Sequence, residues 1–167
     1  PMSLDKQTLE LVLETLREFA TRAIPQNVRL TLDEKEEFPA DIIRGLIGPD
    51  VGLHLVFIPE EYEGLGGGAY DIYRVSEAMA RVDLGVATSM LAIALGTDPI
   101  RVGGTAEQRE KWMTRIALEG LIVAYGVTEP NAGSNVAALK TKAEPIADGG
   151  KTTAYRLNEP NSSSPTD

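Results

Sequence analysis

The stretch Val86-Ala-Thr-Ser-Met-Leu-Ala-Ile-Ala-Leu95 carries apolar side chains on nearly every side of a helix. A helix of this kind is stable in water only when other elements cover it. The stretch therefore predicts a buried helix within a helical bundle. We interpret Met90, Leu91 and Leu95 as core residues, with the wall of an apolar pocket as the alternative.

Amphipathic segments on both sides of this stretch supply helices that could cover it. Apolar residues recur at steps of three and four along residues 9–24, and shorter helices are predicted over 39–46 and 72–82. Thr105-Ala-Glu-Gln108 has the form of a capping box, in which the hydroxyl and the amide each bond a free backbone N–H. The helix that it opens carries Trp112 and Ile116, both expected in the core.

Two intervening segments are predicted to lie outside the helices. The acidic run over 33–37 is interpreted as solvated surface. Residues 58–68 contain four glycines, which cost a regular element too much entropy, so a loop is expected there. Gly64-Leu-Gly-Gly-Gly-Ala69 also fits a dinucleotide-binding fingerprint, but no strand precedes it and its glutamates would repel a pyrophosphate.

The pattern changes after Gly120. Strands are predicted over 121–128, 139–144 and 153–157, with a turn at Asp148-Gly-Gly150 before the last one. The fold class is therefore α+β, mainly α, with a helical bundle followed by the first strands of an incomplete β domain. The predicted organisation has three parts: a helical domain over 1–120, the start of a β domain over 121–158 and a coil tail over 159–167.

Composition excludes several classes of function. The 167 residues carry a formal charge of −9, which disfavours binding to nucleic acid and to anionic lipid. The absence of cysteine removes disulfides and thiol chemistry, and a single histidine, His54, leaves no multi-histidine metal site. No apolar run reaches the length of a membrane span and the start of the sequence lacks the pattern of a signal peptide, so we expect a cytoplasmic protein.

The segment Tyr125-Gly-Val-Thr-Glu-Pro-Asn-Ala-Gly-Ser-Asn135 is the strongest candidate for a binding loop. Pro130 and Gly133 favour a turn after a predicted strand. Two hydroxyls, those of Thr128 and Ser134, and several backbone amides would be offered there with little side-chain bulk. Such a loop can bind a phosphate or the polar edge of a ring, and a purely structural turn is the alternative.

The same residues resemble a known family. Tyr125-x-Val-Thr-Glu-Pro-x-Ala-Gly-Ser-x-Val136, followed by Leu139-Lys-Thr-Lys-Ala143, is similar to the first signature of the flavin-dependent acyl-CoA dehydrogenases. Ile58-Pro-Glu-Glu-Tyr-Glu-Gly-Leu-Gly-Gly67 resembles the family's glycine loop, and residues 98–108 resemble the start of one of its helices. The resemblance covers residues 1 to about 158.

The resemblance implies positions for cofactor and substrate. The family's flavin-ring contacts, followed by its pyrophosphate contacts, fall on Tyr125, Val127, Thr128, Gly133 and Ser134. Ser134 would also lie near the pantetheine arm of the CoA thioester. The acyl tail would lie along the predicted buried helix, beside Thr88, Leu91 and Leu95. Asn135 stands where the family usually has aspartate, which removes one negative charge next to an anionic ligand.

The implied reaction is the α,β-dehydrogenation of an acyl-CoA, with FAD as hydride acceptor and an electron-transferring flavoprotein or similar acceptor as partner. In the family the catalytic glutamate belongs to a C-terminal helical domain, and full-length members are commonly homo-oligomers. By this resemblance we assign no catalytic residue and no metal ligand within the chain. The chain is expected to be a truncated dehydrogenase, inactive alone and with doubtful FAD binding.

The tail supports that expectation. After Asn158 the family continues Asn-Gly-x-Lys-x-aromatic-Ile-Thr-Asn-Gly, whereas this chain reads Asn158-Glu-Pro-Asn-Ser-Ser-Ser-Pro-Thr-Asp167. With suitably chosen codons, one inserted base converts the tail to Asn-Gly-Thr-Glu-Gln-Phe-Ile-Thr-Asn-Gly, which predicts a frameshift. Two alternatives remain open: a non-enzymatic helical interaction module, or subunit completed by a separate chain, and a free-standing CoA carrier.

Overall fold

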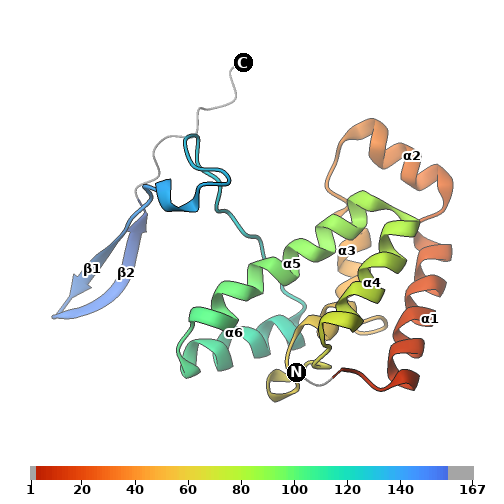
Figure 1. Ribbon diagram of the computed structural model, residues 1–167, viewed down its shortest axis with the longest axis horizontal. Coiled ribbons are helices and arrows are strands. Elements are labelled where there is room, and N and C mark those ends of the chain that lie inside the picture. The colour runs from red at the N-terminus through yellow and green to blue at the C-terminus, as the bar shows by residue number, and fades with distance from the viewer. Residues whose placement is uncertain (1–2, 158–167) are drawn as a thin grey trace. The chain divides into compact units, whose positions relative to one another are not determined.

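The computed structural model describes residues 3–157, so the predicted coil over 159–167 lies outside the described residues. The chain divides into two compact units, Pro1–Tyr125 and Gly126–Asp167. The first unit is helical and the second contains a β hairpin (Figure 1). The predicted α+β class, mainly α, is confirmed.

Six α-helices and two short 3-10 helices make up the described part of the first unit: α1 (Lys6–Ala23), α2 (Gln26–Lys35), α3 (Ala40–Ile47), η1 (Leu53–Phe57), η2 (Glu60–Tyr62), α4 (Ala69–Val82), α5 (Leu84–Gly103) and α6 (Ala106–Glu119). All five predicted helices are present. The prediction that the acidic run over 33–37 is solvated surface is confirmed, because all five residues are exposed, and Asp33 and Glu34 belong to α2, a helix that was not predicted. That helix buries no residue, so it shows no apolar stripe from which it could be predicted.

Short-range hydrogen bonds cap the first turns of three helices. Asp5 caps α1 by accepting from the Thr8 N–H at 3.0 Å and from its hydroxyl at 2.6 Å. The predicted capping box of α6 is present, with Gln108 N donating to Thr105 at 3.2 Å and Thr105 N donating to Gln108 at 2.9 Å. Asp83 caps α5 in the same way, accepting from the Val86 N–H at 2.9 Å.

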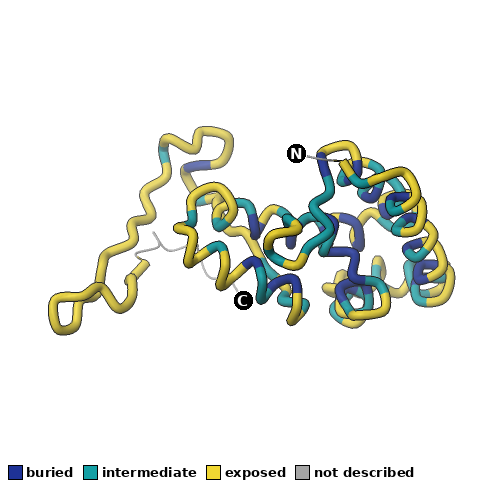
Figure 2. The backbone as a smooth tube through the Cα atoms, turned by 90° about the horizontal axis from the view of Figure 1, so that it is seen from below, coloured by how far each residue is buried: buried dark blue, intermediate teal, exposed yellow. Residues whose placement is uncertain are grey.

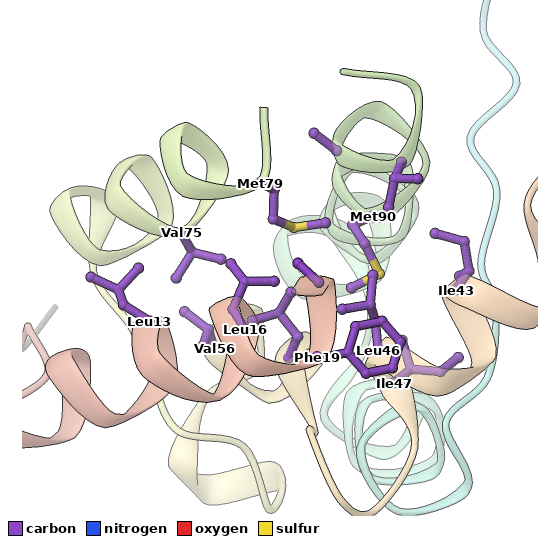
Figure 3. Packing of buried hydrophobic residues seen from close by; sticks show 14 of the residues in the cluster. Leu13, Leu16, Phe19, Ile43, Leu46, Ile47, Val56, Val75, Met79 and Met90 are labelled. Atoms are coloured by element: carbon purple, nitrogen blue, oxygen red, sulfur yellow. The ribbon is translucent and has the colours of Figure 1, made fainter. Parts of the chain in front are cut away.

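One apolar core joins α1, α3, η1, α4 and α5. Figure 3 shows Leu16 and Phe19 of α1 facing Met79 of α4, Met90 of α5 and Leu46 of α3. The residues of this core that are at most 1% exposed are Leu16, Ile43, Leu46, Leu53, Val56, Val75 and Met90. The apolar spacing along 9–24 therefore identified the buried face of α1 correctly.

A second, smaller core lies under α6. Ile58 packs there with Met113, Ile116 and Ala117. The prediction for Ile116 is confirmed, but the prediction for Trp112 is wrong, since that side chain is 39% exposed. Two cationic side chains of the same helix lie over its ring instead: Lys111 Nζ is 5.0 Å and Arg115 Cζ is 5.2 Å from the ring centroid.

The helix predicted from Val86–Leu95 is present, but its burial was overestimated. One side of α5, which includes Val86, Met90 and Ile93, is buried against the core. On the other side Leu95 is 52% exposed and Thr88 is exposed, while Leu91 is partly exposed. The sequence of α5 therefore predicted burial on all sides, whereas only one face of the helix is packed in this unit (Figure 2).

In the second unit β1 (Ala143–Asp148) pairs antiparallel with β2 (Lys151–Leu157), from Ala143↔Leu157 to Asp148↔Lys151, with an irregularity after Ile146. Gly149 and Gly150 have φ of 56° and 79° in the predicted turn. The strand predicted over 121–128 is absent, because that segment pairs with no other strand among the described residues. The strand predicted from 139 begins only at Ala143.

Among residues 3–157, no helix combines the length and the apolar character needed to cross a membrane. Nor do the histidine and acidic side chains of these residues gather in any group of three that could hold a metal ion.

Candidate functional site

The candidate binding loop is closed by a short backbone turn. Glu129 N donates to Ala132 O at 3.1 Å and Ala132 N donates to Glu129 O at 3.0 Å. Ala132 is only 2% exposed, although most of the loop around it is exposed. The turn predicted at Pro130 and Gly133 is thus formed, with the small Ala132 side chain tucked inside it.

The carboxylate of Glu129 holds this turn to the segment that precedes β1. Its Oε2 accepts the N–H of Lys140 and its Oε1 accepts the N–H of Thr141, both at 2.8 Å. The hydrogen bonds from Thr141 and then from Lys140 hold the pKa of Glu129 below its usual range. These bonds also explain why residues 140 and 141 do not begin the predicted strand, since their N–H groups are already used. Sequence reasoning missed this role of Glu129, because the spacing gives no sign of it.

The predicted flavin contacts lie on exposed backbone. Tyr125 is 49% and Val127 38% exposed, and Thr128, Gly133 and Ser134 are exposed as well. A Cβ atom placed on Gly133 would meet nothing within 4 Å, so the backbone there can be approached closely. The charge of Glu129 is engaged by two N–H groups, which lessens its repulsion of an anion. Free hydroxyls, an open backbone and a carboxylate already engaged by two N–H groups fit a ligand with polar edges such as FAD.

The three residues predicted to lie along an acyl tail are only partly brought together. Leu91 and Leu95 line a groove of about 620 Å³, which they share with Ile72 of α4 and with the loop from Phe57 to Glu61. Thr88 is not among its lining residues, and the Thr88 hydroxyl donates to Leu84 O at 2.8 Å. The volume lies within the range of about 300–1,000 Å³ that small-molecule sites occupy.

The glycine loop forms one wall of this groove and is tightly packed. Gly66 N donates to Ile58 O at 2.8 Å and Gly67 N donates to Val56 O at 3.0 Å. A Cβ atom on Gly64 would lie 1.9 Å from Ile58 O, so no larger residue fits without moving the backbone. The glycines therefore serve close packing of the loop on itself, as expected, and not the cradling of a phosphate.

Four charged side chains also line the groove: Glu60, Glu61, Asp98 and Arg101. The single cation among them is bound within α5, where Arg101 Nη2 donates to Asp98 Oδ1 at 2.7 Å and Arg101 Nε donates to the same oxygen at 3.2 Å. Both side chains are about half exposed, at 52% and 50%. An apolar channel with an acidic edge can hold an alkyl chain.

Two buried polar residues lie away from these features. His54 is 3% exposed with its Nε2 3.0 Å from Ala117 O, and burial lowers its pKa, so its role in this unit is structural. Asp71 is fully buried without a cation and was not predicted. Its carboxylate accepts from the Ser3 hydroxyl at 3.0 Å and from the N–H groups of Leu4 and Gly68, each at 2.8 Å.

Comparison with known proteins identifies the family. The profile "Acyl-CoA dehydrogenase, N-terminal domain" matches residues 6–119. The chain is 32% identical over 138 residues to the probable acyl-CoA dehydrogenase YngJ of Bacillus subtilis, covering 80% of the chain and 35% of the relative. It is 36% identical over 135 residues to cyclohex-1-ene-1-carbonyl-CoA dehydrogenase of Geobacter metallireducens, again covering 80% of the chain and 35% of the relative.

Solved structures agree with the sequence relatives. Butyryl-CoA dehydrogenase from Megasphaera elsdenii superposes with a TM-score of 0.75 at 27% identity, covering 95% of the chain and 40% of that protein. An acyl-CoA dehydrogenase from Bacillus anthracis complexed with FAD gives 0.74 at 26% identity, covering 91% of the chain and 25% of that protein. The chain thus spans about a third of the length of the curated relatives it matches. The chain belongs to the acyl-CoA dehydrogenase family and carries its N-terminal domain.

Proposed function

We propose that this chain supplies the N-terminal helical domain, over 1–120, and the first part of the β domain of an FAD-dependent acyl-CoA dehydrogenase. The reaction is the α,β-dehydrogenation of an acyl-CoA thioester. Family membership over residues 6–119 carries the proposal, and the α5 groove agrees with it. An acyl chain in that groove would be kept from water by Leu91, Leu95 and Ile72.

The loop after Tyr125 is proposed to hold the cofactor. Tyr125, Val127 and Thr128 would face the flavin ring, and Gly133 and Ser134 would face the pyrophosphate, with Ser134 also beside the pantetheine arm of the substrate. FAD would supply the hydride acceptor. The chain's own contribution is to present hydroxyl and N–H donors from a turn that Glu129 keeps closed.

Turnover is proposed to need more of the protein than these 167 residues. The sequence matches about a third of its relatives' length, and the resemblance places the catalytic glutamate in a C-terminal helical domain. We accordingly propose no dehydrogenase activity and weak FAD binding for the 167 residues alone. For the whole protein we propose a cytoplasmic homo-oligomer that passes electrons to a separate flavoprotein.

A chimera tests the proposal. Residues 6–141 would replace the matching part of the Megasphaera elsdenii butyryl-CoA dehydrogenase, and reduction of an artificial electron acceptor would be followed with acyl-CoA substrates of increasing length. We expect a yellow protein that turns over at least one of them, and no turnover by the 167-residue chain. A chimera that folds and binds FAD but turns over none of the substrates would contradict the assignment.

A variant pair locates the acyl tail in the same chimera. Leu95→Arg places a cation in the groove and should raise KM for long acyl chains more than tenfold. Val102→Arg is the matched control, because that residue is 78% exposed on the same helix and is not among the lining residues of the groove. Equal effects of the two substitutions on KM would show that the groove does not hold the acyl tail.

A further inference from the structure

The α5 groove combines apolar walls with a charge balance that is negative. Leu91, Leu95 and Ile72 supply apolar surface, and Glu60 and Glu61 approach from the glycine loop. Together with Asp98 they place three carboxylates against one guanidinium along the lining. A groove with this balance repels an anionic group on its occupant.

The state of Arg101 decides whether the groove could still anchor a carboxylate. Both hydrogen bonds that the guanidinium donates go to one oxygen of Asp98, from the position three residues earlier on the same helix. The pair therefore needs no other element to form it, and a bound anion would have to compete with a carboxylate that is always adjacent. Arg101 is thus a neutralised cation and not a free anchor.

We propose that Asp98 is a specificity-determining residue: by engaging Arg101 it makes the groove accept acyl chains with an uncharged far end and reject chains that end in a carboxylate. The inference rests on the proposed function, since it assumes that the groove takes the acyl tail. It goes further, because it names the substrate class by charge. Removal of the Asp98 carboxylate would leave Arg101 free beside an apolar channel, which is the arrangement that a terminal carboxylate requires.

A displacement experiment on the full 167-residue chain tests this assignment. The fluorescent probe N-phenyl-1-naphthylamine is neutral and would occupy the groove, and it would be displaced by 1-octanol or by octanoate at pH 8 and low salt. In Asp98→Asn we expect octanoate to displace the probe at about fivefold lower concentration than in the wild type, with 1-octanol unchanged. Adding Arg101→Gln to that variant should abolish the gain. Comparing each competitor with itself across variants removes the intrinsic difference in their hydrophobicity.

The matched control is Asp41→Asn. Asp41 forms the same kind of pair with Arg44 three residues on, at 3.5 Å and on the exposed surface of α3. This substitution removes an equal charge away from the groove and should leave the octanoate concentration unchanged. A gain in Asp41→Asn equal to that in Asp98→Asn would overturn the proposal, since it would reflect net charge alone.

Leu95→Arg tests whether the groove binds an alkyl chain, separately from whether Asp98 selects the chain by its charge. If this substitution abolishes probe binding and Asp98→Asn still brings no gain for octanoate, the inference about Asp98 is wrong while the groove remains an alkyl site. If probe binding is absent or is insensitive to Leu95→Arg, the groove is not an alkyl site, and both the inference and the acyl-tail assignment fail.

Discussion

The two units of the chain are stabilised in different ways. In the helical unit Leu16, Met90 and Ile116 are at most 1% exposed, and they come from three different helices. In the second unit every residue of β1 and β2 is exposed, and the hairpin is held by its backbone pairing (Figure 2). An isolated two-stranded hairpin is marginally stable in water, whereas a packed core can stabilise a unit by itself. The comparison indicates that the free energy of global unfolding comes from the first unit alone.

Truncation of a core side chain gives the largest expected effect. Leu16→Ala should lower the free energy of unfolding by about 2–5 kcal/mol, because it leaves a cavity among α1, α3 and α4. Tyr155→Ala, in a residue 63% exposed on β2, should change it by less than about 0.5 kcal/mol. Denaturant titration followed by circular dichroism measures both. Equal losses in the two variants would show that the hairpin contributes to the cooperative unit.

The glycine loop allows a sharper comparison within the helical unit. Gly64→Ala should cost about 3 kcal/mol, because the new methyl group would overlap the Ile58 carbonyl. Gly103→Ala adds the same methyl group at the end of α5, where a Cβ meets nothing within 4 Å, and should be neutral or stabilising by up to about 1 kcal/mol. Thermal unfolding of both variants checks the pair. A loss below about 1 kcal/mol for Gly64→Ala would mean that the loop can open without disturbing the core.

The buried carboxylate of Asp71 should make the helical unit sensitive to acid. Burial alone would raise its pKa, but the N–H groups of Leu4 and Gly68 and the Ser3 hydroxyl outweigh burial and hold the pKa below its usual value. The stabilisation is therefore complete above the unfolded pKa of about 3.9 and is lost as the pH falls through the lower folded pKa. Asp71→Asn should cost about 1–3 kcal/mol at pH 7, since a neutral amide oxygen accepts weaker hydrogen bonds from the N–H groups of Leu4 and Gly68 than the charged carboxylate does.

Unfolding free energies measured between pH 7 and pH 2.5 test that assignment. The wild type should lose more stability over the acid part of this range than Asp71→Asn does. Asp33→Asn provides the control, because that residue lies on α2, which buries no side chain. Parallel pH profiles for the wild type and Asp71→Asn would show that another carboxylate is responsible.

The smallest global effect is expected from Glu129→Gln. An amide offers one acceptor oxygen where the carboxylate offers two, so the N–H of Lys140 or of Thr141 loses its partner. Backbone amide exchange at these residues should become several-fold faster, while the denaturation midpoint of the helical unit stays unchanged. Glu144→Gln on β1 is the matched control. A shift of the global midpoint would contradict the separation of the two units.

Much of the fold could be predicted from local chemistry. The α1 stripe, the Thr105 capping box and the turn at Gly149 depend on residues close together in the sequence, and all are present. The errors concern burial and pairing, which depend on distant partners. The apolar pattern of α5 could not reveal that only one side of the helix is packed, and residues 121–128 had the composition of a strand but no strand to pair with among residues 3–157.

In the candidate site, too, features set by neighbouring residues could be predicted, and features that join distant residues could not. The turn in the candidate loop followed from Pro130 and Gly133. The family resemblance grouped Thr88, Leu91 and Leu95, of which only Leu91 and Leu95 line the groove. The Glu129 bonds to Lys140 and Thr141 and the Asp71 bonds to Ser3 and Leu4 could not be predicted. Each joins a carboxylate to backbone or hydroxyl groups distant in sequence, for which residue types carry no signal.

The single histidine of the chain has a practical consequence. His54 joins η1 to the end of α6 through Ala117 O, so its ring lies where two elements of the helical unit meet. One imidazole gives one set of ring-proton resonances in an NMR spectrum, without labelling. Burial lowers its pKa in the native protein, whereas in the unfolded chain it titrates near the usual value of about 6.5. During acidification the ring-proton resonances of His54 would therefore distinguish folded from unfolded molecules, so this side chain reports on the folding equilibrium.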